Sequence, residues 1–120
     1  MKNENLKKRT KKFALDVIKF FESLPKNETC RILGRQLLRS GTSVGANYRG
    51  ACRAKSTADF ISKMGTVEEE ADESAYWIEL LIEDSKVPEV KAGPLLKEAN
   101  ELTAIMVSSI NTARKSGGRP

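Results

Sequence analysis

Arginines in the second quarter of the chain recur at spacings that place them on one side of a helix. At about 100° per residue they fall within a sector of about 80°, opposite the apolar side chains of the same segment. A guanidinium group can form two parallel hydrogen bonds to a phosphate or to a carboxylate. The spacing therefore predicts an anion-binding face, whose members are Arg31, Arg35, Arg39, Arg49 and Arg53.

Further basic side chains gather toward the two ends of the chain, and we expect them to extend the same surface: Lys7, Lys8, Arg9, Lys11, Lys12, Arg114 and Lys115. The formal net charge of +5 is unevenly distributed, with +5 over residues 1–12, +6 over 26–55 and −8 over 56–84. Two interpretations compete. In the first, the arginines face solvent or pair with acidic faces of this or another subunit. In the second, they bind nucleic-acid phosphates. No aromatic ladder accompanies them, so stacking on single-stranded bases is not predicted.

The composition excludes much catalytic chemistry, because the chain contains no histidine. A histidine general base, a Ser-His or Cys-His nucleophile and a histidine-containing zinc or di-iron site are therefore excluded within one chain. The two cysteines, Cys30 and Cys52, form no Cys-x-x-Cys motif, and there is no glycine-rich phosphate loop. We predict no catalytic residue, no metal and no cofactor, and hence a protein that is not an enzyme.

Carboxylates cluster in the third quarter of the chain at Glu69, Glu70 and Glu73. Such groups can hold a divalent cation. Without histidine, and without matching glutamates on the other predicted helices, they are more typical of a salt-bridged flank that faces Arg39 or Arg49.

Four amphipathic helices are predicted to position these groups, because apolar side chains recur every three or four residues. The first is predicted over about residues 6–24. The second begins near Asn27 and continues through the small residues at 40–47. The third follows a capping box formed by Ser56 and Asp59 and ends at about 84. The last begins after Val87-Pro88, with a break or a late start at Gly93-Pro94.

Short connections between these helices predict an all-α fold, an antiparallel up-down four-helix bundle that occupies residues 1–120 as one domain. A mobile basic arm at about residues 1–8 and a frayed basic tail at about 115–120 are expected at its ends. No apolar run is long enough to span a bilayer, and no apolar segment of a secretory signal follows the basic start. We therefore expect a cytoplasmic protein without a membrane partner.

Three segments carry a resemblance to a known family. They are residues 38–47 (Leu-Arg-Ser-Gly-Thr-Ser-Val-Gly-Ala-Asn), 56–64 (Ser-Thr-Ala-Asp-Phe-Ile-Ser-Lys-Met) and 69–81 (Glu-Glu-Ala-Asp-Glu-Ser-Ala-Tyr-Trp-Ile-Glu-Leu-Leu). In order and spacing they resemble the four-helix-bundle proteins of the 23S rRNA-intervening-sequence protein family, also called S23 ribosomal proteins. The resemblance extends from Phe13 to about Arg114.

This resemblance implies an up-down bundle that associates into a ring-like homo-oligomer, typically a pentamer. Related accessory proteins of diversity-generating retroelements form basic pentameric barrels that bind nucleic acid and a reverse transcriptase, whereas most family members have no assigned biochemical function. Residues that match the family's signature are expected at packing and helix–helix polar contacts rather than in a catalytic site. They are Ser40, Ser43, Asn47, Glu70, Glu73, Tyr76 and Trp77.

We therefore expect a non-enzymatic, homo-oligomeric accessory protein that binds RNA or DNA through phosphates, with a reverse transcriptase or another protein as a candidate partner. The alternative is a ring-forming protein–protein scaffold that binds no nucleic acid. In that case the arginine face of one subunit meets the acidic third helix of the next.

Overall fold

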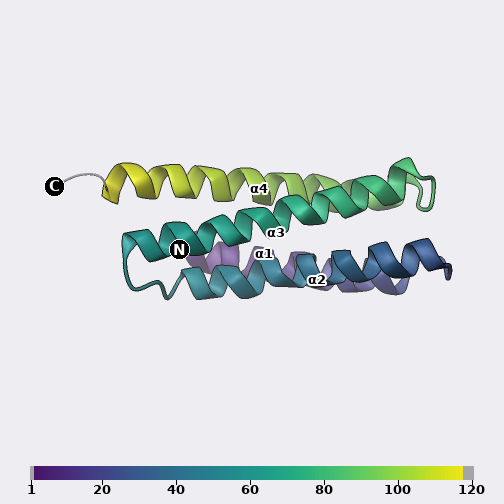
Figure 1. Ribbon diagram of the computed structural model, residues 1–120, viewed down its shortest axis with the longest axis horizontal. Coiled ribbons are helices and arrows are strands. Elements are labelled where there is room, and N and C mark those ends of the chain that lie inside the picture. Colours follow the sequence, from purple (N-terminus) through teal and green to yellow (C-terminus); the bar gives the residue numbers. More distant parts are fainter. Residues whose placement is uncertain (1, 118–120) are drawn as a thin grey trace.

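Four helices run alternately up and down along a rod of 55 × 22 × 20 Å (Figure 1). The structure, a computed structural model, describes residues 2–117. Its helices are α1 (Lys2–Glu22), α2 (Glu28–Ala51), α3 (Thr57–Glu83) and α4 (Glu89–Gly117), and the described part contains no strand. Each helix packs against its neighbours in sequence, and α1 also contacts α4. The predicted all-α four-helix bundle is therefore confirmed.

Side-chain caps start the two middle helices where the sequence predicts them. The side chain of Asn27 accepts a hydrogen bond from the Cys30 amide at 2.9 Å, and that of Ser56 accepts one from the Asp59 amide at 3.0 Å. The predicted capping box differs in one detail. The Asp59 carboxylate accepts from the backbone amide of Lys55 at 3.1 Å, one residue before the expected partner.

The helix α1 starts earlier than predicted. It begins at Lys2, so the arm expected at residues 1–8 is wrong over the described residues, and residue 1 lies outside them. The segment contains no glycine or proline, and Glu4 occupies the first turn, where the helix dipole favours a carboxylate. Leu6 then packs against the core, and the hydroxyl of the buried Thr10 donates to the Leu6 carbonyl at 2.7 Å. These contacts hold the early turns in the bundle.

The helix α4 continues through Pro94, so the predicted break is wrong. Proline supplies no amide donor to the carbonyl four residues earlier, which belongs to Val90. Both Val90 and Pro94 are exposed, so water can hydrate that carbonyl. At the other end, residues 115–117 of the expected tail are helical, and residues 118–120 lie outside the described residues.

One continuous core occupies the inside of the bundle, and every helix contributes to it. Its largest fully buried side chains include Phe13, Val17, Leu37, Val44, Met64, Ile78, Leu81, Leu102 and Met106. None of the helices within residues 2–117 is long and apolar enough to cross a membrane.

Two glycines let α1 and α2 approach closely. A Cβ atom at Gly41 would lie 2.8 Å from a methyl carbon of Val17, and one at Gly45 would lie 3.3 Å from the carbonyl oxygen of Thr10. The same contacts show the antiparallel register of the pair: Gly41 lies beside Val17 and Gly45 beside Thr10, so the end of α2 lies beside the beginning of α1. The lysine-rich start of the chain therefore lies beside the later arginines of α2.

Candidate nucleic-acid interface

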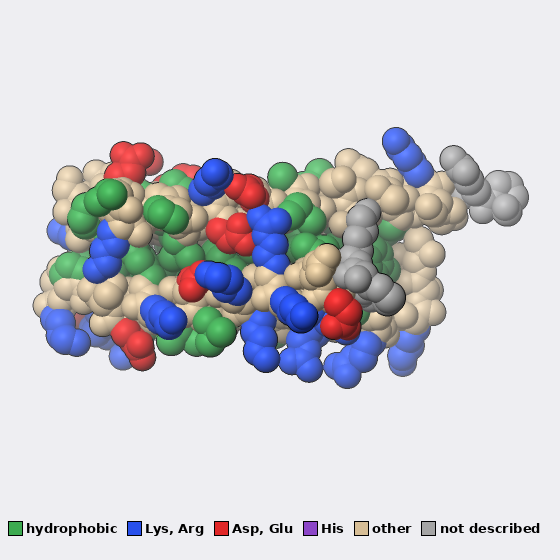
Figure 2. Space-filling view, turned by 180° about the vertical axis from the view of Figure 1, so that it is seen from behind, with side chains coloured by type: hydrophobic (Ala, Val, Ile, Leu, Met, Phe, Trp, Pro, Cys, Tyr) green, Lys and Arg blue, Asp and Glu red, His purple; other side chains and the backbone are tan. Residues whose placement is uncertain are grey.

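A groove between α1 and α2 gathers basic side chains that are distant in sequence. Lys7, Lys8 and Lys11 line it from α1, and Arg49 lines it from α2. The groove has a volume of about 480 Å³, and the rest of its lining is Glu4, Ala14, Thr42, Gly45 and Ala46. Figure 2 shows Lys and Arg side chains gathered along the lower edge of the molecule, over α1 and α2. We call the groove lined by these residues the α1–α2 groove.

Small side chains keep the α1–α2 groove open between its cations. Ala14, Gly45 and Ala46 have no long side chain to fill it, and Gly45 allows the backbone of α1 to approach. The cations of two helices are thereby brought near one another without an intervening bulky side chain. All four cations are among the basic residues predicted from the sequence, but the groove is not predicted; its one sequence signal is the run of small residues at 40–47.

Three of the groove's cations have no acidic partner. Lys8, Lys11 and Arg49 are exposed and form no ion pair within the described part of the chain, whereas Lys7 lies 3.7 Å from a carboxylate oxygen of Glu4. Three unpaired cations around one opening attract an anion more strongly than the same cations spread over the surface, because their fields add.

Two other basic residues of α1 face away from the groove. Arg9 donates two hydrogen bonds of 2.7 Å to the Glu98 carboxylate of α4 and a third of 2.9 Å to Glu101. These contacts raise the pKa of the Arg9 guanidinium, the hydrogen bonds to Glu98 most. Lys12 bonds to Asp16 at 2.7 Å, which raises the pKa of the ammonium group. Arg9 therefore joins α1 to α4, and Lys12 is partly neutralised.

The five arginines predicted to form one face are divided among different surroundings. Arg31 pairs with Glu28, which precedes it by less than one helical turn. Arg49 lines the α1–α2 groove, and Arg53 lies in the turn that follows α2. Arg35 and Arg53 are exposed and without an ion pair among the described residues, as are Arg114 and Lys115 in the last turns of α4.

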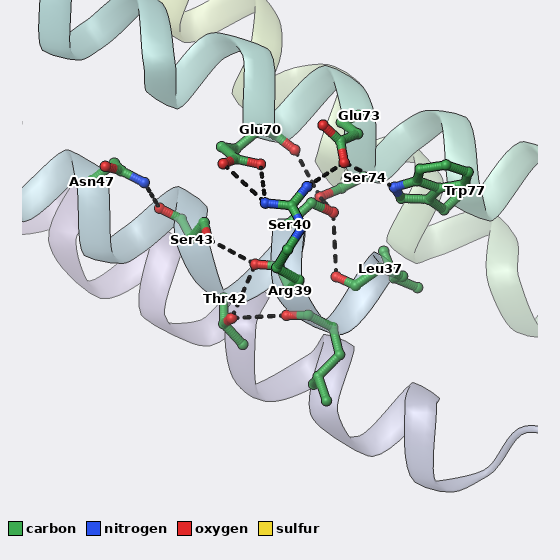
Figure 3. A network of polar contacts seen from close by, with 11 residues as sticks. Leu37, Arg39, Ser40, Thr42, Ser43, Asn47, Glu70, Glu73, Ser74 and Trp77 are labelled. Carbon is green, nitrogen blue, oxygen red and sulfur yellow. Dashed lines mark hydrogen bonds and ion pairs between the residues drawn. The ribbon is translucent and has the colours of Figure 1, made fainter. Parts of the chain in front are cut away.

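Arg39 turns toward α3 instead of solvent. Its guanidinium bonds to both oxygens of Glu70 at 3.3 Å and to the carboxylate of Glu73, and the Trp77 indole donates to the same Glu73 oxygen at 3.2 Å (Figure 3). The hydrogen bonds to Glu70 and then to Glu73 raise the pKa of Arg39. Arg39 thus serves as a link between α2 and α3.

A pair of buried hydroxyls lies beside this link. Ser40 and Ser74 bond to one another at 2.8 Å, across the contact between α2 and α3 (Figure 3). Ser43 and Asn47 instead bond within α2, the serine to the Arg39 carbonyl at 2.7 Å and the asparagine to the Ser43 carbonyl at 2.9 Å. The family-signature residues on α2 therefore divide between interhelical and intrahelical contacts.

Tyr76 is the exposed member of an aromatic pair on α3. Its side chain is 53% exposed, and its ring meets that of the partly buried Trp77 edge to face, with centroids 5.2 Å apart. Acidic side chains surround it on the same helix, and those of Glu69, Asp72 and Glu83 are exposed. Within residues 2–117, no three acidic or cysteine side chains are placed to hold a metal ion together.

Known proteins are similar to this chain in both sequence and fold. The sequence profile of the 23S rRNA-intervening sequence protein family matches residues 2–108. A 1.70 Å crystal structure of a protein of unknown function, from the S23 ribosomal protein family of Bacteroides thetaiotaomicron VPI-5482, is similar with a TM-score of 0.84. It is 33% identical in sequence, over 92% of this chain and 99% of that chain. No curated protein is detectably similar. The profile match includes every residue of the α1–α2 groove.

Proposed function

This chain belongs to the 23S rRNA-intervening sequence protein family, and we propose that it is a non-enzymatic accessory protein that binds the phosphate backbone of RNA or DNA. In this proposal it acts in the cytoplasm as a homo-oligomeric ring, such as a pentamer. The observation that carries it is the convergence of Lys8, Lys11 and Arg49 on one groove, each without an acidic partner in the described part of the chain.

Binding in the α1–α2 groove is electrostatic. Lysine and arginine displace the counterions condensed on a nucleic acid, so the affinity falls steeply as salt rises. No aromatic side chain lines the groove, so it offers no platform for stacking bases. It therefore fits the phosphates of duplex or structured nucleic acid without reading sequence. A ring repeats the groove in every subunit, and this multiplies a modest affinity by avidity.

The test compares two triple variants with the same change in charge. Lys8→Gln/Lys11→Gln/Arg49→Gln removes the unpaired cations of the groove. The control, Lys26→Gln/Lys91→Gln/Lys97→Gln, removes three exposed lysines that have no ion pair within residues 2–117 and lie outside the groove. Binding to duplex DNA and to structured RNA is measured from about 50 to 200 mM salt, with the oligomeric mass of each protein determined alongside.

We expect the groove variant to bind at least tenfold more weakly at the lowest salt. The slope of log affinity against log salt should become shallower by about one for each phosphate that the variant no longer neutralises. The control should change much less. Equal losses of affinity in the two variants would show that net charge alone drives binding, and an unchanged groove variant would place the site elsewhere.

The ring-forming scaffold is a second candidate, and the exposed acidic surface of α3 around Tyr76 favours it. An exposed aromatic ring among charged residues is typical of a contact point for another protein, such as a reverse transcriptase or a second copy of this chain. If the basic groove of one subunit meets this surface of the next, the groove variant dissociates the oligomer. If the groove binds nucleic acid, the oligomer stays intact and only nucleic-acid affinity falls.

A further inference from the structure

A cavity opens at the end of the bundle where α1 and α3 begin and α2 and α4 end. Its volume is about 650 Å³, within the range of small-molecule sites. All four helices contribute to its lining: Leu6, Tyr48, Ala51, Cys52, Ala54, Lys55, Ser56, Thr57, Phe60, Ser109, Ala113 and Ser116. The helix ends meet closely there, because a Cβ atom at Gly117 would lie 2.5 Å from a methyl carbon of Thr57. We call it the end cavity.

Tyr48 is a buried residue, 4% exposed, that brings a hydroxyl group to the lining of the end cavity. Its polar neighbour is the thiol of Cys52, which is a weak hydrogen-bonding group. Burial raises the pKa of Tyr48, so the hydroxyl keeps its proton and can donate to a ligand.

The rim of the end cavity is suited to a phosphate. Lys55 lies on it, beside the N-terminal end of α3 at Ser56 and Thr57, where backbone amides and the helix dipole favour an anion. Arg53 lies two residues before Lys55, and Arg114 and Lys115 directly precede Ser116 of the lining. None of these four cations has an ion pair within residues 2–117.

The end cavity adjoins the α1–α2 groove. Leu6 lines the cavity and Lys7 the groove, and Tyr48 lines the cavity and Arg49 the groove. Each pair consists of consecutive residues, whose Cα atoms are about 3.8 Å apart. The groove and the cavity are therefore lined from adjacent positions of both α1 and α2.

We propose that the end cavity binds one unpaired nucleotide, at the end or in a bulge of the nucleic acid held in the α1–α2 groove. The base lies against Tyr48, Phe60 and Leu6, the Tyr48 hydroxyl bonds to its edge, and Lys55 and the start of α3 hold its phosphate. This inference rests on the proposed function for the strand, but the cavity can be tested separately with a free nucleotide, which has the same chemistry.

The variant Ala113→Leu tests the proposal by filling the end cavity without changing charge. Ala113 is only partly buried, and leucine is a good helix former, so the bundle should keep its fold. Ala104→Leu is the matched control, because Ala104 is an exposed residue of the same helix and does not line the cavity. Affinity is measured for a blunt duplex, for the same duplex with one unpaired 3′ adenosine, and for adenosine 5′-monophosphate alone.

We expect the parent protein and Ala104→Leu to bind the duplex with the unpaired adenosine at least about fivefold more tightly than the blunt duplex. Ala113→Leu should bind the two duplexes equally. A parent protein without this preference, or an Ala113→Leu variant that retains it, would overturn the inference while leaving binding in the groove intact.

If no duplex binds at low salt, the proposed function fails. The inference about the cavity then depends on whether adenosine 5′-monophosphate binds. Saturable binding of adenosine 5′-monophosphate that Ala113→Leu abolishes would then assign the cavity to a free nucleotide. Absence of that binding would refute the cavity as a nucleotide site.

Discussion

Two glycine-to-alanine substitutions are expected to change stability in opposite directions. In a helix, alanine is favoured over glycine by about 1 kcal/mol, because glycine loses more backbone freedom on folding. At Gly65 of α3, an added Cβ meets nothing within 4 Å. Gly65→Ala should therefore raise the free energy of unfolding by about 1 kcal/mol.

The same change at Gly41 meets a rigid neighbour. The new methyl group would lie 2.8 and 2.9 Å from the two methyl carbons of Val17 and 3.2 Å from its Cβ atom. Carbon atoms pack best at about 3.5–4.0 Å, so the two methyl contacts are too short by more than half an ångström. Val17 is fully buried, and its branched side chain has one strongly preferred rotamer in a helix, so it cannot turn aside.

Overpacking of this kind costs about 1–3 kcal/mol, which exceeds the gain in helix propensity. Gly41→Ala should therefore lower the free energy of unfolding by about 1 kcal/mol, leaving the two variants about 2 kcal/mol apart. Urea unfolding followed by circular dichroism measures the difference, at one protein concentration because self-association would add to stability. If Gly41→Ala were as stable as Gly65→Ala, the close packing of α1 on α2 would be refuted.

Three further predictions concern the polar contacts of α2 and α3. Replacing Arg39 by glutamine should lower the free energy of unfolding by at most about 1 kcal/mol, because its ion pairs are half exposed; a larger decrease in urea would contradict this. Ser74→Ala should cost about 1–2 kcal/mol by removing the buried partner of Ser40, and a double-mutant cycle with Ser40→Ala should recover most of that cost as coupling between the two hydroxyls. Asp59 stabilises the fold in its ionised form, because the hydrogen bond from Lys63 and then the one from the Lys55 amide lower the pKa of its carboxyl. Its contribution is therefore complete above the unfolded-state pKa of about 3.9 and is lost as the pH falls through the lower folded-state pKa. The difference in urea midpoint between the parent and Asp59→Asn should accordingly shrink from about pH 6 to about pH 2, and a constant difference would exclude this role.

Helix type, core and most helix boundaries follow from sequence alone, because they depend on short-range physics. The apolar residues of α2, for example Leu37, Val44 and Tyr48, recur with the helical period, and all three are buried. Asn27 and Ser56 cap the helices that follow them through bonds that span three residues. Such interactions need no knowledge of the neighbouring helices.

Pro94 shows where short-range rules were insufficient. Proline inside a helix predicts a break, but the packed residues on both sides of it, such as Ala92 and Leu95, hold the helix against the core. The start of α1 differs from the prediction only in its first turn, where the helix begins at Lys2 instead of near Leu6. At Pro94, burial of the neighbouring residues outweighs a local preference.

Tertiary structure alone decided which cations can meet a ligand. Arg39 and Arg49 lie on the same predicted face of one helix, and helical periodicity treats them alike. They differ because a different helix lies beside each of them: α3 presents Glu70 and Glu73 to Arg39, whereas α1 presents lysines beside Arg49. Periodicity determines the direction in which a side chain leaves its own helix. The register between helices determines which charge it meets there, and hence which arginines remain available to bind an anion.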